Sequence, residues 1–191
     1  TDSTMTFSCG NTLPIVSVPH GMNAWVPETF DAPRPADGWF FSPHHRTTRG
    51  IRCSHQPSPW NGDYACFRLL PQAGPPDFTE GGLSSSFSPE RTTIEPAYFA
   101  TRLHRFEADV SLAPTQRGAV LSTRFAPGTS RARLVLRLVH GRCRAGLAPD
   151  GRTVLASFHA PNHGVRDDLE IHVAVRSSVP VAELVRFGAG V

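Results

Sequence analysis

The sequence has no lysine, no long hydrophobic run and only a small excess of positive charge. All 19 basic residues are arginines, and 16 acidic residues leave a formal net charge of +3. A protein that binds nucleic acid usually gathers its basic residues beside a recognition motif, and no RRM, KH, zinc-finger or helix-turn-helix motif is present. No segment approaches the ~20 apolar residues that a membrane-spanning helix requires. We therefore expect neither nucleic acid nor membrane as a partner.

The densest basic run lies at residues 131–144, where arginines alternate with Leu and Val. This alternation is typical of a strand with one solvated face, so the run is not interpreted as a binding patch. The N-terminus lacks the basic, apolar and small-residue order of a signal peptide. No secretory signal is therefore expected in this sequence, and the compartment stays open between cytoplasmic and secreted.

Motifs for metal and covalent chemistry are also missing. The sequence contains no CxxC, no HExxH and no GxSxG, which are signatures of zinc sites and nucleophilic catalysis. His159 and His163 have HxxxH spacing, but Pro161 argues against the helix that would bring them together. No spacing pairs two carboxylates as general acid and base. We expect no metal site, no catalytic residue and, by default, free buried thiols at Cys9, Cys53, Cys66 and Cys143, among which three pairings are possible.

The residues that are abundant indicate an all-β fold. The chain has 191 residues, of which 18 are proline and 16 glycine, and this excludes a mostly helical protein because each interior proline costs a helix ~3 kcal/mol. Residues 1–95 are rich in loop-forming residues. Beyond residue 97 the sequence predicts short strands at 98–104, 106–112, 118–125, 132–140, 153–159, 169–176 and 181–187.

Turn signals join these strands in an antiparallel manner. Pro149, Asp150 and Gly151 form a turn sequence, because proline fixes φ and glycine accepts a positive φ. Regularly spaced strands without helical periodicity favour a sandwich over a parallel α/β sheet. We expect one domain over residues 1–191, an antiparallel β-sandwich of the large two-sheet kind with a loop-rich N-terminal half.

The segment 49–64, RGIRCSHQPSPWNGDY, is the strongest candidate for a binding site. Two prolines hold it extended, so that His55, Gln56, Trp60 and Asp63 would present polar groups beside one indole. Such a set suits a sugar, whose C–H face packs on an aromatic ring while its hydroxyls bond to polar groups. The alternative is a structural plug, in which Trp60 fills the mouth of the sandwich and Asp63 caps a turn.

A second candidate segment covers residues 7–29. Tight turns at Gly10-Asn11 and His20-Gly21 flank a short apolar run. Asn11, His20, Asn23 and Trp25 would line a pocket there. The alternative is turn chemistry for the asparagines and core packing for Trp25.

Four blocks of this sequence resemble the N-terminal domain of glycoside hydrolase family 92, a family of bacterial exo-acting α-mannosidases. They are FSCGNTLPIVSVPHGMNAWVPET, DGWFFSP, TRGIRCSHQPSPWNGDYACFRLLP and SSSFSPERTTIEPAYFATRL, in this order. The most specific of them is HQPSPW at 55–60, followed by Asp63 and Tyr64. The later strands fit the family only by their pattern.

The resemblance implies a two-domain protein whose N-terminal domain is a β-sandwich. A C-terminal (α/α)6 barrel would supply the general acid, the general base and the ligands of an essential calcium, and the reaction would invert the anomeric centre. This chain would then be the substrate-binding domain of an exo-acting α-mannosidase of α-1,2 type, inactive alone, with the barrel and a mannose-containing glycan as partners. By resemblance, the substrate-binding residues are His55, Gln56, Trp60, Asp63, Asn11 and Trp25.

The sequence departs from the family pattern at three positions. Ala65 and Cys9 replace residues in ways that indicate packing changes, whereas His20 stands where many relatives carry an aromatic residue and puts the linkage specificity in doubt. The resemblance also implies that the barrel is absent from this chain and that a last strand or two of the sandwich is missing. The alternative function is a free-standing β-sandwich that binds carbohydrate or protein, and the reading frame beyond Val191 would discriminate between the two.

Overall fold

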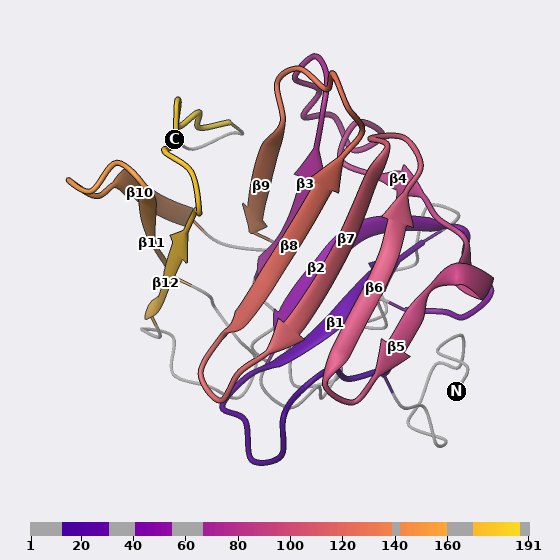
Figure 1. Cartoon of the computed structure of the whole chain (residues 1–191). Helices are drawn as coiled ribbons and strands as arrows, with labels where there is room; N and C mark the ends of the chain where they lie inside the picture. The colour runs from indigo at the N-terminus through magenta and orange to yellow at the C-terminus, as the bar shows by residue number, and fades with distance from the viewer. Residues whose placement is uncertain (1–12, 31–40, 55–66, 139–141, 160–169, 188–191) are drawn as a thin grey trace. The chain divides into compact units, whose positions relative to one another are not determined.

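The computed structural model describes residues 13–30, 41–54, 67–138, 142–159 and 170–187 (Figure 1). Their regular structure is almost entirely antiparallel β-strand, with one 3-10 turn, η2 (Pro89–Arg91), and no α-helix among these residues. None of them belongs to a helix long and apolar enough to cross a membrane. The all-β antiparallel fold class predicted from the sequence is confirmed.

The chain divides into two compact units, Thr1–Arg137 and Leu138–Val191. In the first unit, β1 (Ala24–Thr29), β2 (Thr47–Ser54), β3 (Phe67–Gln72) and β9 (Arg133–Leu138) form a sheet in that order, and the short β4 (Ser85–Ser86) pairs with β2. The pairings of β1 with β2 and of β2 with β3 are antiparallel. The prediction of one domain over residues 1–191 stays a prediction.

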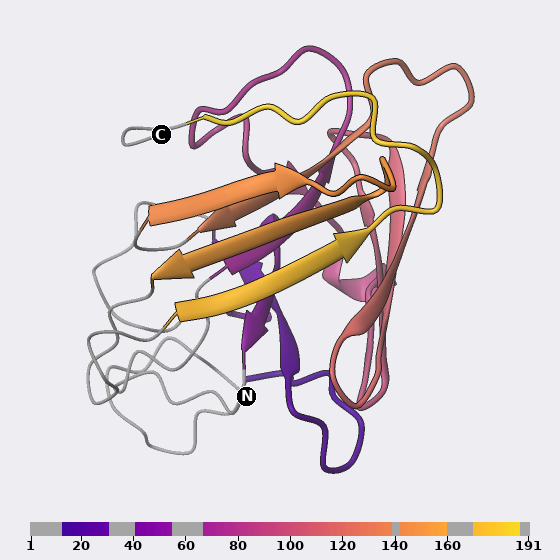
Figure 2. The same cartoon turned by 90° about the vertical axis from the view of Figure 1, so that its left-hand side faces the viewer.

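A second sheet of the first unit is an antiparallel meander. It consists of β5 (Thr93–Glu95), β6 (Tyr98–Leu103), β7 (Ala108–Pro114) and β8 (Ala119–Phe125). On β6, buried Phe99 lies opposite buried Leu112 of β7. Buried Leu103 likewise lies opposite buried Ala108, so these four side chains share one face. The two sheets form separate layers in both views (Figures 1 and 2). The buried face of the meander therefore packs on the first sheet, as in a β-sandwich.

Every residue of β1 and β3 is buried, so both faces of these two strands are covered. Residues directly opposite on neighbouring antiparallel strands share a face. Trp25 lies opposite Cys53, which lies opposite Phe67, and these define one face. Val26, Arg52 and Arg68 are likewise aligned and define the other. One face is thus largely apolar and the other carries charge.

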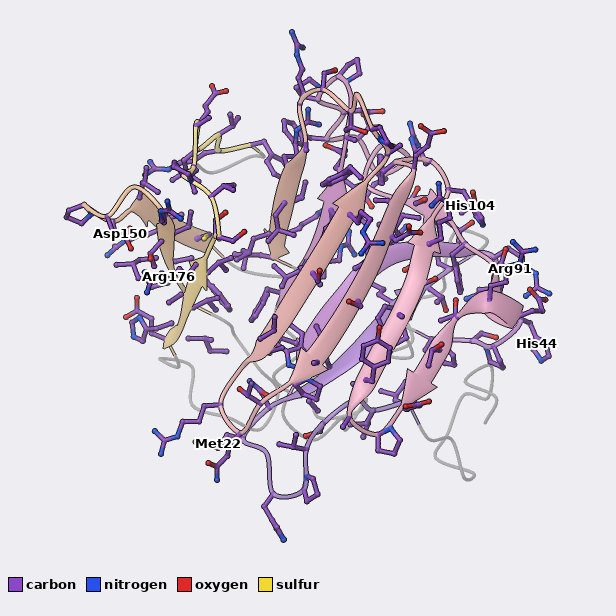
Figure 3. All side chains as sticks on the ribbon, viewed as in Figure 1. Met22, His44, Arg91, His104, Asp150 and Arg176 are labelled. Carbon is purple, nitrogen blue, oxygen red and sulfur yellow. The ribbon has the colours of Figure 1, made fainter. Side chains whose placement is uncertain are left out.

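The second unit contains one three-stranded antiparallel sheet. Its strands are β10 (Arg142–Leu147), β11 (Thr153–His159) and β12 (Glu170–Arg176), in that order. The predicted Pro149–Gly151 turn joins β10 to β11, with Gly151 at a φ of +65° and Asp150 at the turn (Figure 3). On β12 half-buried and exposed residues alternate, as the sequence indicated.

One sequence-based expectation about strands was wrong. The strand expected at 181–187 does not form, although Val181 donates its backbone N–H to the Gly151 carbonyl. Pro180 has no N–H, and the exposed Leu184 and Val185 bury no apolar face there. The loop-rich N-terminal half also contains β1, β2 and β3; every residue of β1 and β3 is buried, so these two strands show no polar–apolar alternation in the sequence.

Candidate functional site

The strand bounds place the strongest candidate segment in the fold. Residues 55–66 join the end of β2, at Ser54, to the start of β3, at Phe67. His55, Gln56, Trp60 and Asp63 therefore belong to the connection between two strands of the first sheet. These four residues, like Asn11, lie outside the described residues, and their predicted roles stay predictions.

Trp25 is the one predicted sugar-binding residue that the structure describes. It is only 6% exposed, and its ring meets Phe67 edge-on with 6.1 Å between the centroids and 84° between the planes. Among the described residues, its buried Nε1 has no hydrogen-bond partner, and neither has the buried Oδ1 of Asn23. Trp25 is thus a core residue, which agrees with the alternative interpretation of core packing drawn from the sequence.

The strand holding Trp25 is entered through a short hairpin. Val16 and Trp25 exchange two backbone hydrogen bonds of 2.8 and 2.9 Å, and Gly21 donates to the Val18 carbonyl at 2.9 Å. His20 lies in this turn with a φ of +56° and is exposed. The turn predicted at His20-Gly21 is confirmed. Because the His20 side chain is exposed, it is available at the surface of this unit.

The charged face of the first sheet holds a buried carboxylate. Glu28 on β1 is 3% exposed, and its Oε2 accepts a hydrogen bond from Nε of Arg52 at 2.7 Å. Its Oε1 accepts a second from Nη1 of Arg68 at 2.6 Å. Burial raises the pKa of Glu28, but the guanidinium groups of Arg52 and Arg68 outweigh burial, so the pKa lies below its usual value. Glu28 is therefore a charged anchor rather than a proton donor.

More arginines extend this charged face. Arg137 on β9 bonds to Oε1 of Glu80, whose Oε2 lies 3.7 Å from Nη2 of Arg49. The Arg49 guanidinium also lies 3.7 Å from the centroid of the Phe30 ring, a cation–π contact. Burial raises the pKa of Glu80, yet Arg137 and Arg49 hold it below its usual value. No residue in the described part of the chain accepts a hydrogen bond from the buried Nε of Arg49 or the buried Nη1 of Arg137.

The interpretation of the basic run at 131–144 as a solvated strand face was wrong for two of its arginines. Arg133 and Arg137 are half-buried. Arg133 donates from Nη1 to Oε1 of Gln72 at 2.5 Å and bonds to the Gly74 carbonyl. Their partners come from residues far earlier in the chain, so no local pattern could have revealed this charged face.

A hollow of about 410 Å³ lies at the far end of β3 from the 55–66 connection. It is lined in part by Gln72, Asp77 and Arg105. Their polar groups are largely satisfied within the protein: Gln72 donates to the carbonyls of Asp77 and Gly82, and Arg105 donates to the Gly81 carbonyl at 2.6 Å. The hollow is therefore a junction of surface loops.

Among the described residues, no three His, Cys, Asp or Glu side chains are grouped so as to hold a metal ion. No chemical step is assigned to a metal in this part of the chain. Cys143 is a free thiol. Burial raises the pKa of the Cys143 thiol, although Arg186 acts in the opposite direction. The raised pKa disfavours a nucleophilic thiolate.

Comparison with known proteins gives a consistent result. Residues 1–188 match the family described as the glycosyl hydrolase family 92 N-terminal domain. The chain is similar to a family GH92 inverting mannosidase from Bacteroides thetaiotaomicron VPI-5482, with 31% identity and a TM-score of 0.80 over 95% of this chain. No curated protein matches the sequence.

The same fold occurs in a second family GH92 α-mannosidase from Bacteroides thetaiotaomicron. The identity is 17% and the TM-score 0.68, over 91% of this chain. That α-mannosidase has also been solved in complex with mannoimidazole, where the TM-score is 0.66 at 18% identity, over 86% of this chain and 22% of that protein. The present chain spans 24% of the length of each of the first two relatives.

Proposed function

Since the chain belongs to the N-terminal domain family of glycoside hydrolase family 92, we propose that it forms the substrate-binding N-terminal domain of an exo-acting, inverting α-mannosidase. The observation that carries this proposal is the family match over residues 1–188. The similarity to an inverting mannosidase at 31% identity supports the reaction class. The proposed substrate is a mannose-containing glycan with an α-1,2 linkage.

The contribution of the domain is to bind and orient the sugar. Trp60 packs against the C–H face of a mannose ring, while His55 and Gln56 bond to its hydroxyls and Asp63 borders the site. Asn11 and Trp25 complete the proposed set. The placement of residues 55–66 between two central strands of a sheet supports this role, because such strands hold both ends of the segment rigidly.

The chemical step is assigned to the second domain of the proposed protein. Among the described carboxylates, Glu28 is fully engaged by arginines, and Asp77 and Asp150 bond within turns. From the family match, we propose that the general acid, the general base and the ligands of calcium reside in a C-terminal (α/α)6 barrel, which is the partner of this domain. When bound there, calcium would supply positive charge that attracts the hydroxyl oxygens of the sugar.

Replacement of Trp60 tests the proposal. In the full-length protein, Trp60→Ala should reduce kcat/KM for release of mannose by ~1–3 kcal/mol of transition-state binding, the scale of one well-packed aromatic ring. The control is Tyr98→Ala, which removes an aromatic side chain that is 40% exposed on the meander sheet and should leave kcat/KM unchanged.

Melting temperature and kcat/KM are measured on the same samples. A fall in kcat/KM with an intact melting temperature supports sugar binding by Trp60. A lower melting temperature with unchanged kcat/KM instead shows that Trp60 is a structural plug, and contradicts the proposed role.

A further inference from the structure

The charged face of the first sheet gathers guanidinium groups from three neighbouring strands. Arg49 lies on β2, Arg68 on β3 and Arg137 on β9, and these strands are adjacent in the sheet (Figure 1). Arg49 and Arg137 both contact the carboxylate of Glu80, which lies in the connection between β3 and β4. In the part of the chain that the structure describes, Glu80 is the one carboxylate that these two arginines contact. Two positive charges therefore share one negative charge.

An irregularity in β2 determines where the Arg49 side chain lies. Consecutive residues of β1 lie opposite Gly50 and Thr48, which leaves Arg49 as an extra residue of β2. Such a bulge interrupts the alternation of side chains between the two faces of a sheet and redirects one of them. The φ of Gly50 is +115°, a conformation that glycine adopts at little cost. The backbone thus departs from a regular strand at the point that sets the direction of Arg49.

Both arginines have hydrogen-bond donors beyond those that Glu80 uses. The buried Nε of Arg49 and the buried Nη1 of Arg137 have no acceptor among the described residues. A buried donor without an acceptor is destabilising, and more so when it belongs to a charged group. Native proteins retain few such groups, so these donors point to a ligand with several oxygen atoms.

Two further groups prepare this place for an anion. The Phe30 ring, whose centroid lies 3.7 Å from the Arg49 guanidinium, holds that group in a fixed plane. Burial lowers the pKa of Arg68, and repulsion from neighbouring arginines, Arg137 among them, lowers it further, although Glu28 acts in the opposite direction. The guanidinium groups therefore repel one another, and a bound anion relieves this repulsion.

Glu80 marks the place where these groups reach the surface. Its side chain is 59% exposed, and the side chains of Arg49 and Arg137 are 24% and 29% exposed. Exposed ion pairs contribute little to stability, because water competes for both partners. An anion of higher charge therefore competes effectively with this carboxylate for the two arginines.

The connection that carries Glu80 is held in place by other contacts. Arg105 donates a hydrogen bond to the Gly81 carbonyl at 2.6 Å, and Gln72 donates one to the Gly82 carbonyl at 3.2 Å. Neither contact involves the Glu80 side chain. This side chain can therefore leave the arginines without displacement of the connection.

We propose that Arg49 and Arg137, with the added charge of Arg68, form a binding site for a tetrahedral oxyanion, phosphate or sulfate, and that the carboxylate of Glu80 competes with this anion. Guanidinium groups bind such anions through paired N–H donors of fixed geometry. The anion is either the free ion or a monoester on a larger molecule, since both present terminal oxygens. None of the predicted sugar-binding residues takes part, so this inference is independent of the proposed function.

Titration calorimetry of the full-length protein with inorganic phosphate tests the site. Phosphate should bind, whereas chloride at equal ionic strength should not. Arg49→Gln and Arg137→Gln should each weaken phosphate binding about tenfold, the effect of one lost charge-assisted hydrogen bond. The matched control is Arg102→Gln, whose exposed guanidinium pairs with Asp109 at 2.8 Å, and it should leave the affinity unchanged.

Removal of the competing carboxylate should act in the opposite direction. Glu80→Gln keeps both arginines and changes only an exposed side chain, so phosphate should bind about threefold to fivefold more tightly, the scale of an exposed ion pair. Asp109→Asn, at a carboxylate of similar exposure, is the control and should change nothing. This variant also decides the question if an arginine variant does not fold. An unchanged or weaker affinity in Glu80→Gln would contradict the site.

Further ligands identify the anion. Similar affinities for methyl phosphate and inorganic phosphate would support the site and show that it accepts a monoester, whereas binding of inorganic phosphate alone would support a site for the free ion. Acetate that binds as tightly as phosphate would overturn the assignment to a tetrahedral oxyanion. Absence of binding by both phosphate and sulfate, or an equal loss of affinity in Arg102→Gln, would overturn the site itself.

Discussion

Individual buried residues show most directly how this sequence departs from a simple apolar core. Glu28 keeps its charge inside the first unit because two guanidinium groups are within hydrogen-bonding distance. The folded-state pKa of Glu28 lies below its value in the unfolded chain. Its contribution to stability is therefore present above the unfolded pKa of ~4.3 and is lost as the pH falls through the folded pKa.

Glu28→Gln should lower the free energy of unfolding at pH 7 by about 3 kcal/mol, because two buried arginines lose their counter-charge. Between about pH 5 and pH 3 the wild-type protein should lose more stability than the variant does, since the variant has no carboxylate to protonate at this position. Urea denaturation at several pH values measures both. If the free energy of unfolding changed with pH in the same way for both proteins, Glu28 would not be the group whose ionisation stabilises the fold.

Gly50 is required by the backbone conformation and by the close approach of a neighbouring strand. Its φ is +115°, a value that side-chain-bearing residues rarely adopt. A Cβ at this position would lie 2.2 Å from the carbonyl oxygen of Leu69 on β3. Close approach of β2 and β3 therefore requires glycine here.

Gly50→Ala should reduce the free energy of unfolding by more than ~3 kcal/mol, because backbone strain and a backbone clash add together. Gly74→Ala is the matched control: its φ is +84° but no atom lies within 4 Å of the added Cβ, so only the strain of about 1 kcal/mol remains. Chemical denaturation of both variants checks the difference. Equal losses would show that the contact with Leu69 is unimportant.

At the scale of elements, the turn between β10 and β11 shows how one side chain joins two strands. Asp150 accepts hydrogen bonds from the backbone N–H groups of Arg152 and Thr153 and from the Thr153 hydroxyl, at 2.9, 2.9 and 2.6 Å. The Thr153 hydroxyl and these N–H groups lower the pKa of Asp150 to about 2. A charged Asp150 therefore stabilises the turn at neutral pH.

Asp150→Asn should lower the melting temperature at pH 7, because the neutral amide accepts these hydrogen bonds more weakly than a carboxylate. The pKa of Asp150 is depressed in the folded chain, so the wild-type advantage is present above pH ~4 and lost as the pH falls toward about 2. Melting curves at a series of pH values should show the two proteins converging at the acidic end. A constant difference down to pH 2 would contradict this role.

At the scale of the whole molecule, the chain corresponds to about a quarter of its relatives, spanning 24% of the length of each of the first two. The proposed reaction needs a general acid and a general base, each of which typically contributes ~10²–10⁴-fold to the rate. Both are assigned to the barrel domain. The chain of residues 1–191 by itself should thus bind sugar weakly and catalyse nothing.

The purified chain should release no mannose from α-mannosides, with or without added calcium, under conditions in which the full-length protein does. The control is a mock preparation from the same host without the gene, which measures contaminating mannosidase. Calcium-dependent release by the chain above that background would overturn the division of labour between the two domains.

The sequence by itself determined the all-β class, the turn at residues 149–151 and the family. Strands with one wetter face, such as β6, β7 and β12, are visible because the local pattern of polar and apolar residues records which side meets water. Proline and glycine at a turn likewise act through their own backbone preferences. These are local properties, and a single chain segment is enough to express them.

Only the tertiary structure decided the roles of the buried charges and of the strands covered on both faces. Glu28 and Arg68 are 40 positions apart in the sequence, and no local pattern couples them. β1 and β3 show no alternation, because the sheet is covered on both sides. The environment of a side chain depends on which distant segment packs against it, so an arginine that belongs to a solvated strand in one fold becomes half of a buried ion pair in this one.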